Sequence, residues 1–346
     1  MNYNMTSNYR MNFNQYLSQF ETPKGEKFTN TSMCYPKKSY HIPDEKYPEF
    51  LQKYQLALDD GSDLHLTEKP SQYSPIRIDL DFKFENDNTK DRKYNHQNLE
   101  VIISEYCKLL QTHFNTTDIT CYLLEKPESS TFRGKIKDGV HIIFPDIKLS
   151  YDLQHFIRDN IIKNPTVIQE FKNMHVINSI SDIVDKAVIS QNVWFLYGSK
   201  KLESHSYLVT KVYQYTSQLL QSNLTSEKSF VQYLSMRNTL SDNSISIKDD
   251  KKYIFDEYLK KNTKKIDNNP KTNNNILKFK DDDTFILAKK LVNECLSIDR
   301  VDSYDDWSKL GWCLRNIDER LLDTWIEFSK NSSKFKDGAC ENIWVA

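Results

Sequence analysis

The sequence predicts an α+β fold followed by a small all-α module. In the first 260 residues, two kinds of apolar pattern alternate. Short runs of apolar and β-branched residues, which are typical of strands, lie between longer segments whose apolar residues recur at helical spacing. After a polar segment, only the helical pattern continues, and tryptophan becomes frequent in it. These observations indicate a mixed domain first and a helical bundle second.

The expected strands and helices are mixed along the first part of the chain. Strands are expected at 76–84, 119–125, 139–144 and 207–215. In the expected helices, apolar residues recur every three or four positions, so that one face of each can pack on a core. These helices are expected at 11–20, 44–54, 98–113, 152–164 and 165–174. Strands that alternate with helices in this way are typical of an α+β domain.

Composition divides the chain into four parts. Residues 1–27 form a polar N-terminal segment, and 28–259 hold all the expected strands and form the main domain. Asn, Lys and Asp dominate 260–283, where too few apolar residues are present to bury a core, so we expect a polar linker. Residues 284–346 carry three apolar stripes at helical spacing and are expected to form the helical module. The last residues fall inside a further expected helix, which suggests that the module is truncated.

Charge and cysteine content limit the class of protein. The formal net charge of −1 gives no general basic field, so any nucleic-acid binding must depend on local patches. The six cysteines show no CxxC or Cys/His spacing, which argues against a zinc ribbon and for reduced thiols. No apolar segment resembles a signal peptide or a membrane span. We therefore expect a soluble intracellular protein.

Two carboxylates on one strand are the most informative feature of the sequence. Asp79 and Asp81 are separated by one residue within an apolar run. Because alternate residues of a strand point to the same side, the two aspartates should project together while Ile78, Leu80 and Phe82 face a core. Adjacent anions repel each other unless a cation bridges them. Hard oxygen ligands suit Mg²⁺ or Mn²⁺, although nucleases, glycosyltransferases and solvated acidic strands show similar pairs.

Two later motifs could belong to the same site, but each has a structural explanation when taken alone. His141 begins an apolar strand and is preceded by Lys137 and a glycine, and a lone histidine there is more often structural than functional. Asp185 follows two apolar residues, and such an aspartate is more often a cap or turn residue. A Gly-Ser-Lys-Lys turn that includes Lys200 and Lys201 follows it.

The order of these motifs resembles the three motifs of the archaeo-eukaryotic primase superfamily. The similarity is greatest to the N-terminal part of the primase-helicases of nucleocytoplasmic large DNA viruses, includes Ser39 to Asp44, and covers about residues 28–215. The tryptophan-rich segment from Asp305 to Trp344 is similar to the small helical module that follows the primase domain in those proteins. The resemblance implies an RRM-like catalytic sheet in the first domain.

The resemblance also implies a chemistry. In primases of this kind, three carboxylates hold two divalent ions, Mg²⁺ or Mn²⁺, and Asp79, Asp81 and Asp185 match those positions. His141, Lys137 and Lys200 match residues that contact the incoming nucleotide. The implied function is template-directed nucleotidyl transfer by a DNA primase or primase-polymerase, as part of a viral primase-helicase.

The implied partners are a single-stranded DNA template, nucleoside triphosphates and a hexameric helicase domain or subunit, with no membrane. The helicase is expected outside this chain, because the sequence contains no Gly-x-x-x-x-Gly-Lys-Ser/Thr loop. The implied location is the host cytoplasm or a viral replication factory.

Two departures from the family pattern bear on nucleotide affinity. Gly139 stands where the middle motif often has serine, and no arginine follows Asp185 within its motif, which leaves Lys200 and Lys201 as the nearby bases. Two alternatives therefore stay open. One is a catalytically degenerate module that only binds single-stranded DNA, and the other is a metal-dependent nuclease.

Overall fold

The computed structural model describes residues 6–344 apart from 88, 90, 217–218, 224–228, 238–244 and 269–280. The chain divides into two compact units, residues 1–260 and 261–346, and each is described by itself. Among the described residues, every helix is too short or too polar to cross a membrane.

An antiparallel six-stranded sheet is the centre of the first unit. Its strands are β5 (Tyr73–Glu85), β6 (Ile119–Glu125), β7 (Ser130–Phe132), β8 (Lys135–Ser150), β10 (Leu208–Thr216) and β11 (Leu219–Asn223). The order is β11-β10-β6-β8-β5, and β7 pairs with β8 as a hairpin. Strands β5 and β6 lie on either side of β8 and are connected through helix α3 (His96–His113). This split β-α-β arrangement fits the expected RRM-like sheet, and the predicted α+β class is confirmed.

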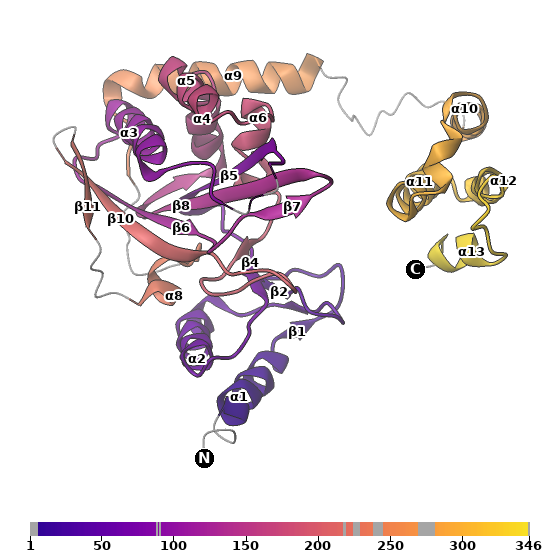
Figure 1. The fold of residues 1–346 in the computed structure, drawn as a ribbon, viewed down its shortest axis with the longest axis horizontal. Coiled ribbons are helices and arrows are strands. Elements are labelled where there is room, and N and C mark those ends of the chain that lie inside the picture. Colours follow the sequence, from indigo (N-terminus) through magenta and orange to yellow (C-terminus); the bar gives the residue numbers. More distant parts are fainter. Residues whose placement is uncertain are drawn as a thin grey trace. The chain divides into compact units, whose positions relative to one another are not determined.

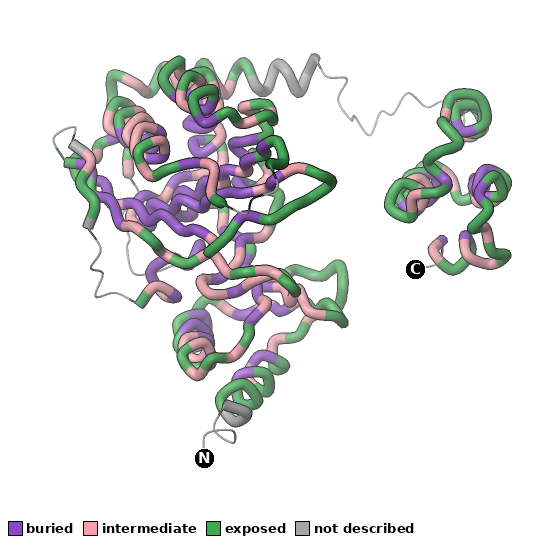
Figure 2. Tube along the Cα trace, in the orientation of Figure 1, coloured by how far each residue is buried: buried purple, intermediate pink, exposed green. Residues whose placement is uncertain are grey.

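Helices cover one face of this sheet and bury the largest core of the unit. Figure 1 shows α3, α4 (Tyr151–Ile161), α5 (Pro165–Asn173) and the start of α9 (Lys252–Asn268) on that side. Ile78, Leu80 and Phe82 point into this core, as the alternation in the sequence predicts. The buried strands appear as a continuous layer in Figure 2. Asn95 caps α3 by accepting a hydrogen bond from the Asn98 amide, which fixes where this covering helix begins.

The predicted strand at 139–144 is only the middle of β8. The strand extends to Lys135 because its polar first residues pair with β7, and to Ser150 because its last residues pair with the start of β5. The register with β5 shifts beside Pro75, which cannot donate to the ladder.

A smaller sheet and two helices pack on the other side of the unit (Figure 1). The sheet has the order β1-β3-β2-β4-β9, and its strands are β1 (Glu21–Thr22), β2 (Asn30–Ser32), β3 (Ser39–Tyr40), β4 (Leu66–Glu68) and β9 (Trp194–Phe195). Helices α1 (Thr6–Ser18) and α2 (Tyr47–Asp59) share a second core with it. Sequence analysis did not predict this sheet, because strands of two or three residues are too short to show a period.

Short helices complete the first unit. They are η1 (Asp44–Lys46), α6 (Ile180–Ile183), α7 (Ala187–Ser190), α8 (Phe230–Tyr233) and η2 (Asp249–Lys251). Helix α9 runs to Asn268, so the first residues of the predicted linker 260–283 are helical. Residues 269–280 of that linker lie outside the described residues, and the domain boundaries stay a prediction.

The second unit is the predicted helical module. It consists of α10 (Asp281–Cys295), η3 (Ile298–Val301), α11 (Tyr304–Ile317), η4 (Glu319–Leu321), α12 (Leu322–Ser329) and α13 (Ala339–Trp344). Trp325 is fully buried and packs between Trp307 and Trp344. Gly311 is needed beside it, because a Cβ at this position would lie 2.4 Å from the Trp325 ring. One of the three apolar stripes predicted in this module consists of Phe285, Leu287, Ala288, Leu291 and Val292, but Leu287 and Leu291 are exposed.

Candidate active site

The two aspartates lie on the sheet face opposite the helix-covered core. In the β5–β8 register, Asp79 is opposite His141 and Asp81 is opposite Gly139. Directly paired residues share one face of a sheet, so these four positions lie together. Lys137 is two residues before Gly139 and therefore lies on the same face. The alternation predicted for β5 thus brings together residues that are about sixty positions apart in the chain.

Asp185 is brought to this face by the segment between α6 and α7. Its amide donates to the Asp79 carbonyl at 3.0 Å, and Val184 forms an isolated bridge with Leu80. The Arg158 guanidinium donates to the Val184 carbonyl at 2.9 Å and fixes the segment just before Asp185.

The segment after Asp185 is fixed by Arg77, which is buried. Its Nε donates to the Val188 carbonyl at 2.7 Å, and another nitrogen donates to the Ile189 carbonyl. Arg77 therefore binds the backbone of α7, and its charge is used for that purpose rather than for pairing with a carboxylate of the site.

A cavity of about 600 Å³ lies over this face and reaches the small sheet at β4 and β9. All six residues that the sequence assigned to the site line it: Asp79, Asp81, Lys137, His141, Asp185 and Lys200. The structure therefore brings the six residues to one cavity, while their roles remain predictions.

Asp79 is the most perturbed carboxyl group of the site. Burial, together with the neighbouring charges of Asp81 and Asp185, raises the pKa of Asp79 to about 8. Its Oδ1 atom is buried and accepts no hydrogen bond, and the Nε2 atom of His141 lies 3.7 Å from it. An unsatisfied, buried carboxylate oxygen beside two further carboxylates is unfavourable unless a proton or a cation neutralises it.

The donor set of the site fits a hard divalent cation, but the carboxylates do not surround one position. Within the described ranges, no three His, Cys, Asp or Glu side chains form a ready group of metal ligands. Asp81 pairs with Lys137 at 3.2 Å, and Asp185 Oδ1 accepts a hydrogen bond from the Ala187 amide at 2.8 Å. Asp185 is thus a turn-capping residue as well as a cavity residue. Asp79 Oδ1 is the oxygen best placed to accept a cation.

The cavity holds both predicted lysines and two further ones, Lys126 and Lys201. Lys137 faces Asp81, but Lys200 pairs with Asp63 at 2.8 Å, away from the aspartate pair. Lys126 lines the same cavity: burial lowers its pKa, and the charges of Lys201 and Lys137 lower it further. Sequence analysis missed Lys126, although its position directly after the predicted strand 119–125 was a usable signal, and it assigned Lys200 rather than Lys201.

His141 is held between two aromatic rings. Its ring stacks on Tyr207 with centroids 3.6 Å apart, and the Trp194 ring centroid lies 4.2 Å away on a tilted plane. Burial and the nearby charges of Lys126 and Lys201 lower the pKa of His141 to about 3, so the imidazole is neutral near pH 7. The two rings, which sequence analysis did not assign, orient a neutral imidazole in the cavity.

Gly139 is required by the close approach of β5 and β8. A Cβ atom at this position would lie 2.5 Å from the Leu80 carbonyl oxygen and 3.5 Å from Asp81 Oδ1. The departure from the family's serine therefore follows from local packing, because a side chain at position 139 would push the two strands apart beside the aspartates.

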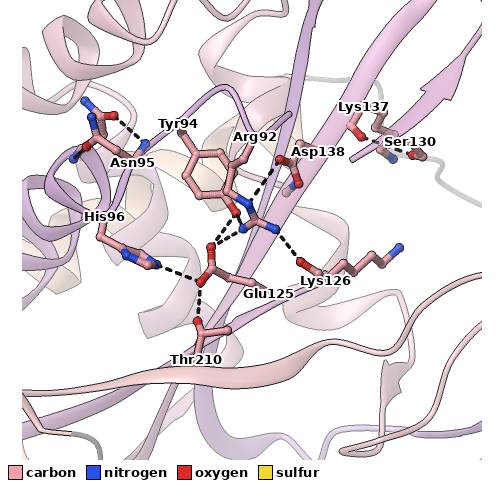
Figure 3. A network of polar contacts seen from close by, with 12 residues as sticks. Arg92, Tyr94, Asn95, His96, Glu125, Lys126, Ser130, Lys137, Asp138 and Thr210 are labelled. Atoms are coloured by element: carbon pink, nitrogen blue, oxygen red, sulfur yellow. Dashed lines mark hydrogen bonds and ion pairs between the residues drawn. The ribbon is translucent and has the colours of Figure 1, made fainter. Parts of the chain in front are cut away.

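A buried charged network lies behind the site, on the helix side of the sheet (Figure 3). The Arg92 guanidinium pairs with Glu125, lies 3.9 Å from Asp138, and donates to the Lys126 carbonyl. Three further side chains bind the Glu125 carboxylate: Tyr94, His96 and Thr210. Glu125 ends β6, Asp138 belongs to β8 and Thr210 to β10, so the network connects three strands. It fixes the backbone from which Lys126 and Lys137 extend.

Comparisons with known proteins identify the family of the chain. Residues 29–213 match the family model described as "C962R protein N-terminal AEP domain", and residues 289–346 match the model "Primase C terminal 2 (PriCT-2)". The two domains are thus those of a primase-type protein. The chain belongs to the archaeo-eukaryotic primase superfamily, as its motifs predicted, and the two matches occur in the predicted order.

Two viral proteins are similar to almost the whole chain. "Putative helicase L207/L206" of Acanthamoeba polyphaga mimivirus is 32% identical over 93% of this chain and 37% of its own length. "Putative helicase 184R" of Invertebrate iridescent virus 6 is 27% identical over 92% of this chain and 36% of its own length. The chain therefore spans little more than a third of these relatives.

Proposed function

We propose that this chain is a template-directed nucleotidyltransferase that synthesises primers on single-stranded DNA, as a DNA primase or primase-polymerase. The observation that carries the proposal is the crowding of Asp79, Asp81 and Asp185 at one cavity, with a buried Asp79 oxygen that has no hydrogen-bond donor. The site combines this anionic cluster with lysines, which is the combination that a triphosphate and divalent cations need.

Asp79, Asp81 and Asp185 would hold two divalent cations, Mg²⁺ or Mn²⁺. When bound, such cations lower the pKa of an attacking 3′-hydroxyl and stabilise the leaving pyrophosphate in an in-line displacement. The carboxylates supply the negative charge that attracts the cations. The alternation of β5 sets the spacing of Asp79 and Asp81, and the hydrogen bond from the Asp185 amide to the Asp79 carbonyl places Asp185 beside them.

The basic side chains of the cavity would bind the incoming triphosphate. Lys126, Lys137 and Lys201 are the lysines whose charges act on one another and on Asp79 or His141, so they are close enough to share one polyanion. A neutral His141 would donate a hydrogen bond to a phosphate oxygen rather than supply a charge. Lys200 would join them only by leaving Asp63.

The partner proposed for the whole protein is a hexameric helicase domain or subunit. Both similar viral proteins are named as helicases, and this chain covers little more than a third of each. The described helical module would then connect the primase domain to that helicase.

The test is synthesis of labelled di- and oligonucleotides on an unprimed single-stranded template with Mg²⁺ or Mn²⁺. We expect product from the wild-type chain and none from the Asp79→Ala/Asp81→Ala double variant. The exposed Asp118, whose carboxylate accepts a hydrogen bond from the neighbouring Thr117, provides a matched control, and Asp118→Ala should retain synthesis. Product from the double variant at the wild-type rate would contradict the assignment of the site.

Two other outcomes would identify the alternatives. Binding of single-stranded DNA without either priming or primer extension would favour a degenerate binding module. Degradation of DNA that needs the divalent cation but no nucleoside triphosphate would favour a nuclease. The triphosphate dependence separates these reactions, because hydrolysis requires only water as the attacking group.

A further inference from the structure

A basic and aromatic hairpin forms part of the rim of the cavity. Strand β7 pairs with the start of β8, with Phe132 opposite Lys135. The turn between them consists of Arg133 and Gly134, with φ angles of 49° and 72°. Two consecutive left-handed residues give the tight hairpin turn that follows the right-handed twist of its strands. The three residues of β7 are exposed and pair only with β8, so the hairpin projects from the main sheet.

Phe132 at this rim is not part of the hydrophobic core. Its side chain lies at the cavity that holds Asp79 and Asp81, yet the residue is 58% exposed. The Arg133 guanidinium lies 5.3 Å from the centre of the Phe132 ring. Within the described part of the chain, Arg133 pairs with no carboxylate. An exposed aromatic ring and an unpaired cation therefore stand side by side at the mouth of the candidate site.

The chemistry of this pair fits single-stranded nucleic acid. A base can stack on an exposed aromatic ring whatever its sequence, and an adjacent guanidinium can bind the phosphate that follows. Lys135 and Lys137 on the same hairpin pair with Glu85 and Asp81, so Arg133 supplies the free positive charge at this rim. A strand bound here would be continuous with the cavity, because Ser130, Thr131 and Phe132 line it.

We propose that the β7–β8 hairpin binds single-stranded DNA next to the catalytic cavity, with a base stacked on Phe132 and a phosphate on Arg133. The proposal rests on the proposed function, because it takes the bound DNA to be the template of primer synthesis. It assigns the hairpin as the surface that places this strand beside the carboxylates.

Binding is measured by the fluorescence anisotropy of a labelled oligodeoxythymidylate at several salt concentrations, with the full chain. Phe132→Ala should weaken binding about 5- to 150-fold, which corresponds to the loss of about 1–3 kcal/mol for one stacked base. Phe132→Trp should retain binding, because indole offers a larger stacking face. Arg133→Gln should lower the slope of log Kd against log salt by about 0.7, while Phe132→Ala leaves that slope unchanged.

Tyr73 provides a matched control for the aromatic ring. It is 60% exposed at the beginning of β5 and does not line the cavity. Tyr73→Ala should bind the oligonucleotide like the wild-type chain. Because Phe132 and Tyr73 are both exposed, neither substitution removes core packing, and thermal melting should be unchanged in both. Equal affinity of Phe132→Ala and wild-type chains for the oligonucleotide, or no binding by the wild-type chain, would overturn the proposal.

The failure of this inference can be told apart from the failure of the proposed function. Primer synthesis by the wild-type chain, with the same template KM in Phe132→Ala, would overturn the hairpin proposal and leave the proposed function standing. DNA binding that depends on Phe132, in a chain that makes no product, would support the hairpin and contradict the function.

Discussion

Replacing Asp79 with asparagine should make the metal-free protein more stable at alkaline pH. Burial and the charges of Asp81 and Asp185 raise the pKa of Asp79 from 3.8 to about 8. In the unfolded chain the carboxyl group loses its proton near its ordinary pKa, whereas in the folded chain it keeps the proton until about pH 8. The stability that this group contributes is therefore complete below about pH 4 and is lost as the pH rises through about 8.

The size of the effect follows from the width of that window. Each pH unit between the two pKa values changes the free energy of unfolding by about 1.4 kcal/mol. Between about pH 5 and about pH 8, Asp79 alone can therefore lower the stability of the wild-type chain by up to about 4 kcal/mol. Asparagine has nearly the same shape and does not titrate, so the stability difference between variant and wild type should grow by that amount.

The assay is urea unfolding of both chains in a chelating buffer across this pH range. Asp118→Asn is the control, because Asp118 is exposed and should leave the pH profile of unfolding unchanged. Magnesium added at about pH 8 should stabilise the wild-type chain more than Asp79→Asn, because the cation binds only the folded carboxylate cluster. A stability difference that is the same at both ends of the range would refute the crowding of charge at Asp79.

Two further substitutions test the surroundings of the site. The side chains of Glu125 and Asp138 are only 4% and 2% exposed, and Arg92 is the cation that they share. Arg92→Ala would leave both carboxylates buried without it and should lower the free energy of unfolding by about 3–5 kcal/mol. Lys93→Ala, on the same loop, removes a more exposed ion pair and should cost less than about 1 kcal/mol in the same urea titration, so equal losses would argue against the network. Gly139→Ser should lower the free energy of unfolding by about 1–3 kcal/mol and reduce primer synthesis, because the serine Cβ would meet the Leu80 carbonyl. An unchanged unfolding midpoint would show that the two strands can separate there without loss of stability.

The main features of the fold could be predicted from local pattern. The strand at 119–125 occurs with the predicted bounds, and α3 begins only two residues before the predicted helix at 98–113. Both elements are long enough to show a clear period, and both pack on one core. The small sheet has no such signal, because its strands are short, and β4 and β9 join it only through contacts distant in sequence. For Leu287 and Leu291 the sequence pattern predicts burial that the structure does not show. The apolar stripe on α10 is wider than the helix face that the module buries.

The candidate site was predictable where a motif lies on one strand. Asp79, Asp81 and His141 share a sheet face, and the alternation of β5 and β8 is enough to place them there. The position of Lys126 depends on how β6 lies beside β8, and that of Tyr207 on the loop before β10. No spacing of residues within one segment of the sequence predicts the position of either side chain. The ion pair that draws Lys200 to Asp63 likewise joins segments that only the tertiary fold brings together.

The pairing of β5 with β8 makes assembly of the site all-or-none. A slip of one residue between these strands would turn Asp79 and Asp81 toward the helix-covered core and expose Leu80 and Phe82 on the other face. Such a misregistered chain would bury two charges and lose its apolar core together, so it could not persist as a folded but inactive form. The hydrophobic core therefore rejects the one-residue slip that would remove the carboxylates from the cavity.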